Sequence, residues 1–395
     1  MKIVIAPDKF KGSLTARKVA MALAFGLQEA KLPKVKIDIV PMADGGDGTV
    51  DVLVNATGGR IVEQVATDPL GRLIVTEFGV LGDNKTAVIE MAKASGLDLV
   101  WQPKVGVDDR NPLITTTYGT GELIKAAMRE GCTKFIIGIG GSATNDGGAG
   151  MAKALGAHLL DKKGRELEPG GGALDKLMEI DVFSLNKQVI RKLNVKVACD
   201  VKNPLCGPNG ASMVYGRQKC PERWSEEEKL TVLKKLDSNL VHYAKIIKTT
   251  RGITNKNVQN CKGAGAAGGL GAGLMAFLNA SLKSGGDLVA GYVELENHLR
   301  NADLVITGEG GTDSSTKFNK VPVVVARYAK NHKLPVICVS GTVMSDGYEI
   351  HKYGIDVLLS ITPRPMRLEE CITNTAELLR RTGEEIGRML AIGER

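Results

Sequence analysis

Short apolar runs alternate with a helical pattern at the N-terminal end of the chain. Residues 2–6 (KIVIA) and 36–41 (KIDIVP) have the length and character of strands. Between them, residues 15–30 carry apolar positions at helical spacing, with Thr15 placed to cap the helix. Nearly continuous apolar strands separated by helices are typical of a parallel sheet covered on both faces. The pattern therefore predicts a strand–helix–strand unit at this end.

The same alternation returns near the C-terminal end. Three more strands are predicted at residues 303–308, 335–341 and 355–361, and a long helical pattern follows the last of them. The simplest assembly joins both groups of strands in one parallel sheet of the flavodoxin-like type, built from both chain ends. The predicted fold class is α/β, with two α/β domains.

The central part of the chain reads differently. The strings TEFGVLG and TAVIEMA indicate antiparallel strands, and helical and strand patterns alternate after them. We interpret this part as an inserted mixed α/β domain, and a length of 395 residues favours two domains. The expected boundaries are residues 1–75 plus 295–395 for the discontinuous flavodoxin-like domain and residues 76–294 for the insert.

Composition argues against several classes of protein. No apolar run approaches about 18 residues, and Pro7 ends the first run too early for a signal peptide, so we expect a cytoplasmic protein with no membrane partner. Seven cysteines without a C-x-x-C pair favour reduced thiols, and five scattered histidines argue against zinc. The net charge is +8, but the lysines are dispersed and aromatic residues make up only 4%. Small anions, rather than nucleic acid, are therefore the expected partners.

Four glycine-rich or acidic stretches follow predicted strands, at the edge where open α/β sheets bind ligands. They are residues 6–16, 42–51, 138–148 and 306–320. In the first stretch, a lysine and a hydroxyl before a helix suit phosphate or carboxylate, although a capped turn with solvated lysines is an alternative. In the second, two aspartates on a glycine turn suit Mg²⁺ and its waters, and Asp–Gly turn chemistry is the alternative.

The third stretch belongs to GIGGSATNDGGAGMAKALGA, which has seven glycines among its twenty residues. It lies between a strand-type run and a helix-type run. A strand, a glycine turn and a helix aim backbone N–H groups at an anion, whereas a tight connection needs only positive φ. Because Ser142 and Thr144 add hydroxyls, we favour a phosphate or carboxylate site.

The fourth stretch places Glu309 and Asp313 among glycines and hydroxyls, with Lys320 close behind. Carboxylates and lysines at the end of a strand are the components of phosphoryl transfer, as metal ligands and charge neutralisers. A serine-rich surface loop is the alternative.

Two lesser stretches add candidates, and two familiar motifs do not match. Asp200 ends a predicted strand before Lys202 and Asn203, and Thr120 lies at a probable helix start. The chain contains no G-x-x-x-x-G-K-[ST] loop. The string GIGGSA lacks the third glycine of G-x-G-x-x-G, which disfavours an NAD-dependent dehydrogenase.

Taken together, these strings resemble the bacterial class I glycerate kinase family. KIVIAPDKFKGSLTA, ADGGDGTVD, TAVIEMAKASGL, RNPLITTTYGTGELI, GIGGSATNDGGAGMAKALGA, VACDVKNPLCGPNGA, GAGAAGGLGAG and LVITGEG occur in family order over essentially the whole chain. The resemblance implies transfer of the ATP γ-phosphate to D-glycerate, with ATP and Mg²⁺ as cofactors. It implies 2-phosphoglycerate as the more common bacterial product. A 3-phosphoglycerate product, or a non-catalytic sensor of an organic acid or nucleotide, stays open as an alternative, and the oligomeric state is not predicted.

The stretches and the resemblance together give three sets of candidate residues. The catalytic candidates are Asp8 and Asp200, which would orient or deprotonate the acceptor hydroxyl, and Lys11. The expected substrate- and nucleotide-binding residues are Ser13, Asp44, Gly45, Gly46, Gly48, Thr120, Gly140, Gly141, Ser142, Asn145, Asp146, Gly147, Lys202, Asn203, Gly308, Gly310 and Lys320. The expected Mg²⁺ ligands are Glu309 and Asp313.

The fourth stretch departs from the family pattern. Gly311 stands where the family usually has Arg, Ser315 where it has Gln, and Asn319 where it has Gly. Loss of a guanidinium from a phosphate site costs about 3 kcal/mol of transition-state stabilisation. Weakened activity, or a shifted nucleotide or acceptor preference, is therefore open.

Overall fold

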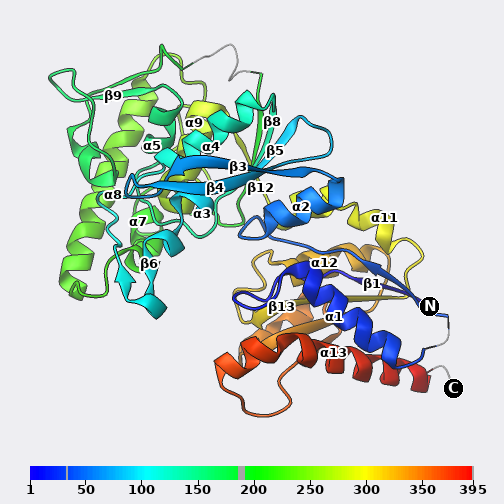
Figure 1. Cartoon of the computed structure of the whole chain (residues 1–395). Coiled ribbons are helices and arrows are strands. Elements are labelled where there is room, and N and C mark those ends of the chain that lie inside the picture. Colours follow the sequence, from blue (N-terminus) through cyan, green and yellow to red (C-terminus); the bar gives the residue numbers. More distant parts are fainter. Residues whose placement is uncertain (33, 186–191, 394–395) are drawn as a thin grey trace. The chain divides into compact units, whose positions relative to one another are not determined.

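The computed structural model describes residues 1–32, 34–185 and 192–393, which form two compact units (Figure 1). Unit 1 comprises Met1–Asp44, Asp51–Thr57 and Ser284–Arg395. Unit 2 comprises Gly45–Val50 and Gly58–Lys283. Each unit is built around a sheet of its own.

Unit 1 contains a parallel sheet made from both ends of the chain. Its strands are β1 (Lys2–Ile5), β2 (Lys36–Ile39), β13 (Leu304–Thr312), β14 (Val336–Val343) and β15 (Val357–Ser360). All neighbouring pairs are parallel, in the order β2-β1-β13-β14-β15. Counted within the unit, this is the order 2-1-3-4-5 of flavodoxin-like sheets. The predicted sheet is confirmed.

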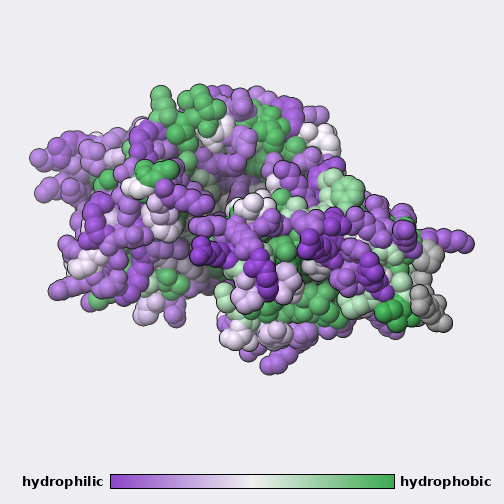
Figure 2. Space-filling model, turned by 60° about the horizontal axis from the view of Figure 1, so that its bottom comes forward, coloured by the Kyte–Doolittle hydropathy of each residue, from purple (hydrophilic) through white to green (hydrophobic). Residues whose placement is uncertain are grey.

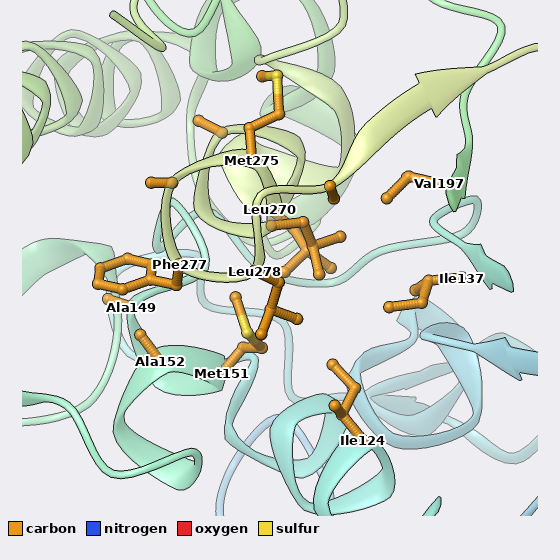
Figure 3. Close-up of a cluster of buried hydrophobic side chains, with 14 of the residues drawn as sticks. Ile124, Ile137, Ala149, Met151, Ala152, Val197, Leu270, Met275, Phe277 and Leu278 are labelled. Atoms are coloured by element: carbon orange, nitrogen blue, oxygen red, sulfur yellow. The ribbon is translucent and has the colours of Figure 1, made fainter. Parts of the chain in front are cut away.

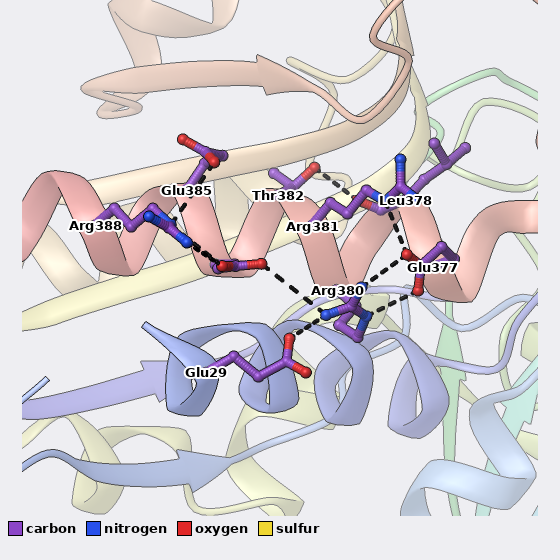
Figure 4. A network of polar contacts seen from close by, with 9 residues as sticks. Glu29, Glu377, Leu378, Arg380, Arg381, Thr382, Glu385 and Arg388 are labelled. Carbon is purple, nitrogen blue, oxygen red and sulfur yellow. Dashed lines mark hydrogen bonds and ion pairs between the residues drawn. The ribbon is translucent and has the colours of Figure 1, made fainter. Parts of the chain in front are cut away.

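Helices α1 (Ala16–Glu29) and α13 (Leu368–Gly393) cover one face of this sheet. Thr15 caps α1 as predicted, because its hydroxyl accepts a hydrogen bond from the backbone N–H of Lys18 at 3.4 Å. The two helices pack backbone against backbone: a Cβ on Gly26 would lie 1.8 Å from the carbonyl oxygen of Arg380. Figure 4 shows Arg380 reaching from α13 to Glu29 of α1. The unit also contains α10 (Gly285–Tyr292), α11 (Leu295–Leu299) and α12 (Val321–Asn331).

Unit 2 contains a mixed six-stranded sheet. Its strands are β3 (Arg60–Thr67), β4 (Leu73–Val80), β5 (Thr86–Glu90), β8 (Lys134–Gly138), β11 (Asn194–Ala198) and β12 (Ser281–Lys283). The order is β12-β11-β8-β5-β4-β3, and β4 runs antiparallel to both of its neighbours while the other pairs are parallel. The antiparallel pair β4–β5 comes from the two strings that indicated it in the sequence.

Three helices of unit 2 share one apolar core with this sheet. They are α4 (Tyr118–Arg129), α5 (Ala149–Ala154) and α9 (Leu270–Leu278). Ile137 of β8, Ile124 of α4, Met151 of α5 and Leu278 of α9 meet in this core (Figure 3). The glycine-rich stretch before α5 is thereby held between a buried strand and a buried helix.

Smaller elements complete the two units. They are α2 (Thr49–Thr57), α3 (Ala92–Ser95), α7 (Ala211–Tyr215), α8 (Glu226–Thr249), β6 (Trp101–Gln102), β7 (Val107–Asp108), β9 (His158–Leu160) and β10 (Glu179–Asp181). Helix α8 begins with a reciprocal capping box, in which the Ser225 hydroxyl accepts from Glu228 N–H and the Glu228 carboxylate accepts from Ser225 N–H.

The face shown in Figure 2 is mainly hydrophilic, with apolar residues in scattered groups. Within the described residues, no helix combines the length and the apolar character needed to span a bilayer. All seven cysteines are free thiols.

Candidate active site

In unit 1, β1 ends beside the first half of β13, because Ile5 pairs with Ile306 and β13 continues to Thr312, and the backbone N–H of Asp8 donates to Gly308 O at 2.8 Å. Asp8 follows β1 closely, and Glu309 lies three residues beyond the paired Ile306. The order of strands reverses between β1 and β13, which makes this the topological switch point where flavodoxin-like sheets bind ligands. The fold therefore brings together the first and fourth predicted stretches.

Asp8 is a buried acid, with only 8% of its surface exposed. Its Oδ1 accepts a hydrogen bond of 2.7 Å from the backbone N–H of Lys9. Burial, helped by the nearby carboxylates of Asp44 and Glu309 and opposed by the charge of Lys9, raises the pKa of Asp8 to about 7. Asp8 is consequently a carboxyl group that exchanges its proton near neutral pH.

Glu309 and Asp313 share one cation, the ammonium group of Lys320. The Lys320 Nζ lies 3.5 Å from Glu309 Oε2 and 3.6 Å from Asp313 Oδ1. Glu309 also accepts hydrogen bonds from the hydroxyls of Thr316, at 2.6 Å, and Thr312, at 3.2 Å. Burial raises the pKa of Glu309, whereas hydrogen bonds from Ser315 lower the pKa of Asp313.

The oxygen atoms of this pair suit Mg²⁺. Among the described residues, no three or more His, Cys, Asp or Glu side chains gather as a metal site would require. Magnesium is commonly held by one or two carboxylates, with substrate phosphates and waters as its other ligands. Two carboxylates that already converge on one cation fit that pattern, so Glu309 and Asp313 stay predicted ligands.

In unit 2, three parallel strands end at the same edge. Glu90 of β5 and Ala198 of β11 both pair with Gly138 of β8, and Asp200 follows two residues later. Glu90 accepts a hydrogen bond of 2.8 Å from the backbone N–H of Val50. This edge carries the third predicted stretch and the strand end before Lys202.

The second and third glycine stretches touch each other within unit 2. A Cβ on Gly138 would lie 2.1 Å from the carbonyl oxygen of Gly45, and a Cβ on Gly140 would lie 3.4 Å from the Cα of Gly46. Gly48 has a φ of +87°, which favours glycine. Glycines occur here partly because the two backbone segments lie too close together to leave room for side chains.

The exposed part of the third stretch is its first turn. Gly140 and Gly141 are exposed, and Ser142 is 8% exposed. Lys219, which is 1% exposed, donates hydrogen bonds to Ser142 Oγ at 2.8 Å and to the carbonyl oxygen of Thr144 at 2.7 Å. Burial lowers the pKa of Lys219 to about 7, and the charge of Asp146 opposes that shift.

Several candidate residues make contacts within the protein that give them a structural role. Asp146 is buried and accepts hydrogen bonds from the backbone N–H groups of Thr117 (2.8 Å), Gly148 (3.0 Å) and Gly150 (3.1 Å). Its carboxylate joins the starts of α4 and α5.

Other candidates have contacts of the same internal kind. The hydroxyls of Thr120 and Ser95 lie 2.8 Å apart. The Ser13 hydroxyl donates a hydrogen bond to the carbonyl oxygen of Ile372 at 3.0 Å. The side-chain amide of Asn145 donates to Ser212 Oγ at 2.9 Å, and that of Asn203 donates to the carbonyl oxygen of Asn209 at 2.8 Å. A Cβ on Gly308 would lie 2.2 Å from Val339 O, one on Gly147 would lie 2.7 Å from the Tyr243 ring, and one on Gly310 would lie 3.3 Å from Lys11 N. Lys11 and Lys202 have exposed side chains.

Two residues of the site were not singled out by the sequence. Glu90 could have been found, since an acid directly after the apolar run TAVI has the same pattern as Asp200 after its strand. Lys219 carries no such signal. It is a single lysine in the short turn Arg217–Lys219, and only the fold shows that it is buried beside Ser142.

Comparisons with known proteins point to one family. A sequence profile described as "Glycerate kinase family" matches residues 3–391. The chain is 48% identical over 394 residues to a glycerate kinase of Bacillus subtilis (strain 168), covering 100% of this chain and 99% of that protein. It is 47% identical over 395 residues to the glycerate 2-kinase of Escherichia coli (strain K12), with the same coverage.

A solved structure agrees with these relatives. The fold matches, with a TM-score of 0.85 and 43% identity, a crystal structure of a candidate glycerate kinase 2 from Salmonella typhimurium LT2. That match covers 100% of this chain and 99% of the crystallised chain. The chain therefore belongs to the glycerate kinase family.

Proposed function

We propose that the protein transfers the γ-phosphate of ATP to a hydroxyl of D-glycerate and releases 2-phosphoglycerate. The observation that carries the proposal is the buried Asp8 carboxyl, which lies among acids at the switch point of a flavodoxin-like sheet in a member of the glycerate kinase family. The 2-phospho product is favoured over the 3-phospho product because a relative with 47% identity is named glycerate 2-kinase.

Asp8 would act on the acceptor hydroxyl. A general base works best when its pKa lies near the working pH, and the pKa of Asp8 is raised to about 7. As the carboxylate, Asp8 would accept the hydroxyl proton while the hydroxyl oxygen attacks the γ-phosphorus and the bond to ADP breaks. Asp200, two residues after the end of β11 in unit 2, is the alternative candidate for the residue that orients the acceptor hydroxyl.

Glu309 and Asp313 would hold Mg²⁺, and Lys320 would neutralise phosphate charge. Bound Mg²⁺ supplies charge compensation to the phosphates during the transfer. Lys320 already lies within 3.6 Å of both carboxylates, so it can pair with phosphate oxygens when the carboxylates bind another cation. Thr316 and Thr312 fix the Glu309 carboxylate by hydrogen bonds.

In unit 2, the turn at Gly140 and Gly141 would bind an anionic oxygen. Its two glycines are exposed, and they precede the Ser142 hydroxyl on the carboxyl edge of the sheet. Backbone N–H groups in such turns bind phosphate or carboxylate. Lys202, exposed at the same edge, would add a positive charge.

The test is ADP formation from ATP and Mg²⁺ with and without D-glycerate, followed by phosphorus NMR of the product. D-Glycerate-dependent ADP with a phosphorus signal coupled to the C2 proton supports the proposal, while coupling to the C3 protons moves the product to 3-phosphoglycerate. A rise in Tm on ligand binding without ADP would instead support the sensor. The matched variant Asp8→Asn keeps the shape of the side chain and removes the base.

A further inference from the structure

The Ser142 hydroxyl has a hydrogen-bonding direction that its neighbour dictates. A serine hydroxyl can donate one hydrogen bond and accept two, whereas an ammonium group can only donate. Lys219 Nζ lies 2.8 Å from Ser142 Oγ, so while Lys219 is protonated the lysine donates and the serine oxygen accepts. Among the described residues, Ser142 Oγ makes no other hydrogen bond within the protein. Its own proton is therefore left without an acceptor in the part of the chain that the structure describes.

Lys219 is held firmly enough to impose this direction. It is 1% exposed, and its second hydrogen bond, 2.7 Å long, goes to the carbonyl oxygen of Thr144 in the same loop. Two bonds from one ammonium group to residues 142 and 144 clamp the loop that follows Gly141. The charged group facing Lys219 is Asp146, which is itself fixed by backbone N–H groups at the start of α5.

The ammonium also polarises the serine. A hydroxyl that accepts a hydrogen bond from a cation becomes a stronger donor, because chains of hydrogen bonds reinforce one another at low dielectric. Ser142 keeps 8% of its surface exposed beside the exposed turn of Gly140 and Gly141. The hydroxyl proton and the turn can thus serve the same ligand atom.

We infer that Lys219 is a positioning residue that orients Ser142 as a hydrogen-bond donor to an anionic oxygen of a substrate. This inference rests on the proposed function, in which the turn at Gly140 binds that oxygen. The oxygen belongs either to the phosphates of ATP or to the carboxylate of D-glycerate, which share the chemistry that the donor recognises.

The experiment is a double-mutant cycle with Ser142→Ala, Lys219→Met and the double variant. The readouts are kcat and KM for each substrate, and Kd for ATP and for D-glycerate by isothermal titration calorimetry. Each single variant is expected to lower kcat/KM about 100-fold, as for the loss of one preorganised donor. The kcat/KM of the double variant should be no lower than that of the more impaired single variant, because both changes remove the same donor.

The ligand is identified by which constant changes. Weaker binding of ATP alone assigns the oxygen to phosphate, and weaker binding of D-glycerate alone assigns it to the carboxylate. Lys153→Met is the matched control, since Lys153 also donates to a backbone carbonyl, Leu167 O, at 2.7 Å, but does not contact this loop. It should leave all constants unchanged.

Three outcomes would overturn the inference. They are unchanged constants in Ser142→Ala, multiplying effects in the cycle, and effects in Lys219→Met that consist only of a lower Tm. If Lys219→Met does not fold, unchanged constants in Ser142→Ala would still overturn the inference. If the wild-type protein binds ligand without turnover, the proposed function fails, and the Kd values alone test the inference. If it binds neither ATP nor D-glycerate, both fail.

Discussion

The ammonium of Lys320 lies 3.5 Å from the Glu309 carboxylate, which is 6% exposed. A buried carboxylate that loses its cation is left uncompensated, because desolvation penalises the charged form. In the proposed function, this pair would bind metal and phosphate at the end of β13. It is also the easiest part of unit 1 to test.

We predict that Lys320→Met lowers kcat/KM for ATP about 100-fold or more, because it removes a charge neutraliser from the phosphates. Steady-state kinetics at saturating D-glycerate measures the effect. Lys317→Met is the matched control, since Lys317 pairs with Glu349 at 2.9 Å instead. Equal kinetics in the two variants would remove Lys320 from the site.

The second prediction concerns pH and activity. Because Asp8 must be ionised to accept a proton, and because burial raises its pKa to about 7, kcat/KM should rise with pH through that value. Asp8→Asn should lose at least about 100-fold in kcat and lose this acidic limb of the profile. Rate measurements from pH 5 to 9 check both. An acidic limb that persists in Asp8→Asn would assign it to another group.

The third prediction concerns pH and stability. The pKa of Asp8 in the folded protein lies above its ordinary value of 3.8, so folding favours the protonated form. The stability linked to this group is fully present below about pH 4 and is lost as pH rises through about 7. Asp8→Asn should therefore raise Tm by about 5 °C at pH 8 and by little at pH 4.

Thermal unfolding without nucleotide or Mg²⁺ measures this effect, because a bound cation would itself favour the carboxylate. An Asp8→Asn variant that is less stable than wild type at pH 8 would show that the carboxylate is a net stabilising group. Asp8 would then not be a strained acid kept for chemistry.

The fourth prediction concerns Gly311, where the family usually has Arg. A Cβ there would meet only Thr342 Cγ2, at 3.4 Å, which is an ordinary contact. Gly311→Arg should therefore fold with an unchanged Tm and raise kcat/KM for ATP about 10-fold, because a guanidinium is added beside Glu309. Gly308→Ala is the contrasting variant, since its Cβ would lie 2.2 Å from Val339 O. That variant should lose stability.

The fifth prediction separates structure from binding at Asp146. Its carboxylate accepts three backbone hydrogen bonds in a buried site, so Asp146→Asn should lower the free energy of unfolding by about 3 kcal/mol. Urea denaturation measures the loss, with the exposed Glu227→Gln as control. A variant of wild-type stability but reduced activity would return Asp146 to the ligand-binding residues.

The sheet of unit 1 could be predicted because its central strands are buried on both faces. The runs that form β1 and β13 are apolar almost throughout, and the burial of Ile3, Ile5 and Ile306 follows from that pattern. β3 gave no such signal. It is an edge strand that pairs only with β4 and exposes Ile61 and Val65, so its sequence RIVEQVAT shows no buried run.

This missed strand explains why the expected boundary at residue 75 differs from the observed division. Residues 58–75 belong to unit 2, where Arg60–Thr67 pair with β4, and residues 284–294 belong to unit 1. The pairing of two strands in a hairpin depends on their register and on the turn between them. The pattern of apolar residues along one strand does not reveal either.

The sequence predicted on which sheet edges the candidate residues lie, but not which residues their side chains contact. Glycines and acids after strands were expected at the carboxyl edges of the sheets, and the fold places them there, because the carboxyl ends of parallel strands lie at one edge. The partner of a hydroxyl depends on the tertiary fold: Thr120 faces Ser95, and Ser142 faces Lys219. No spacing in the sequence distinguishes these two hydroxyls.

The pairing of β1 with β13 has a consequence for the newly made chain. In a chain that is still being synthesised, Ile3 has no pairing partner on the β13 side until Leu304 has been made. Likewise, α1 has no α13 to pack against until the C-terminal end has been made. During translation, unit 2 can therefore fold first, while the N-terminal segments of unit 1 stay unfolded and accessible to chaperones. Such distant partners slow the search for the native arrangement, and a ribosome that stalls before β13 leaves an uncovered strand open to aggregation.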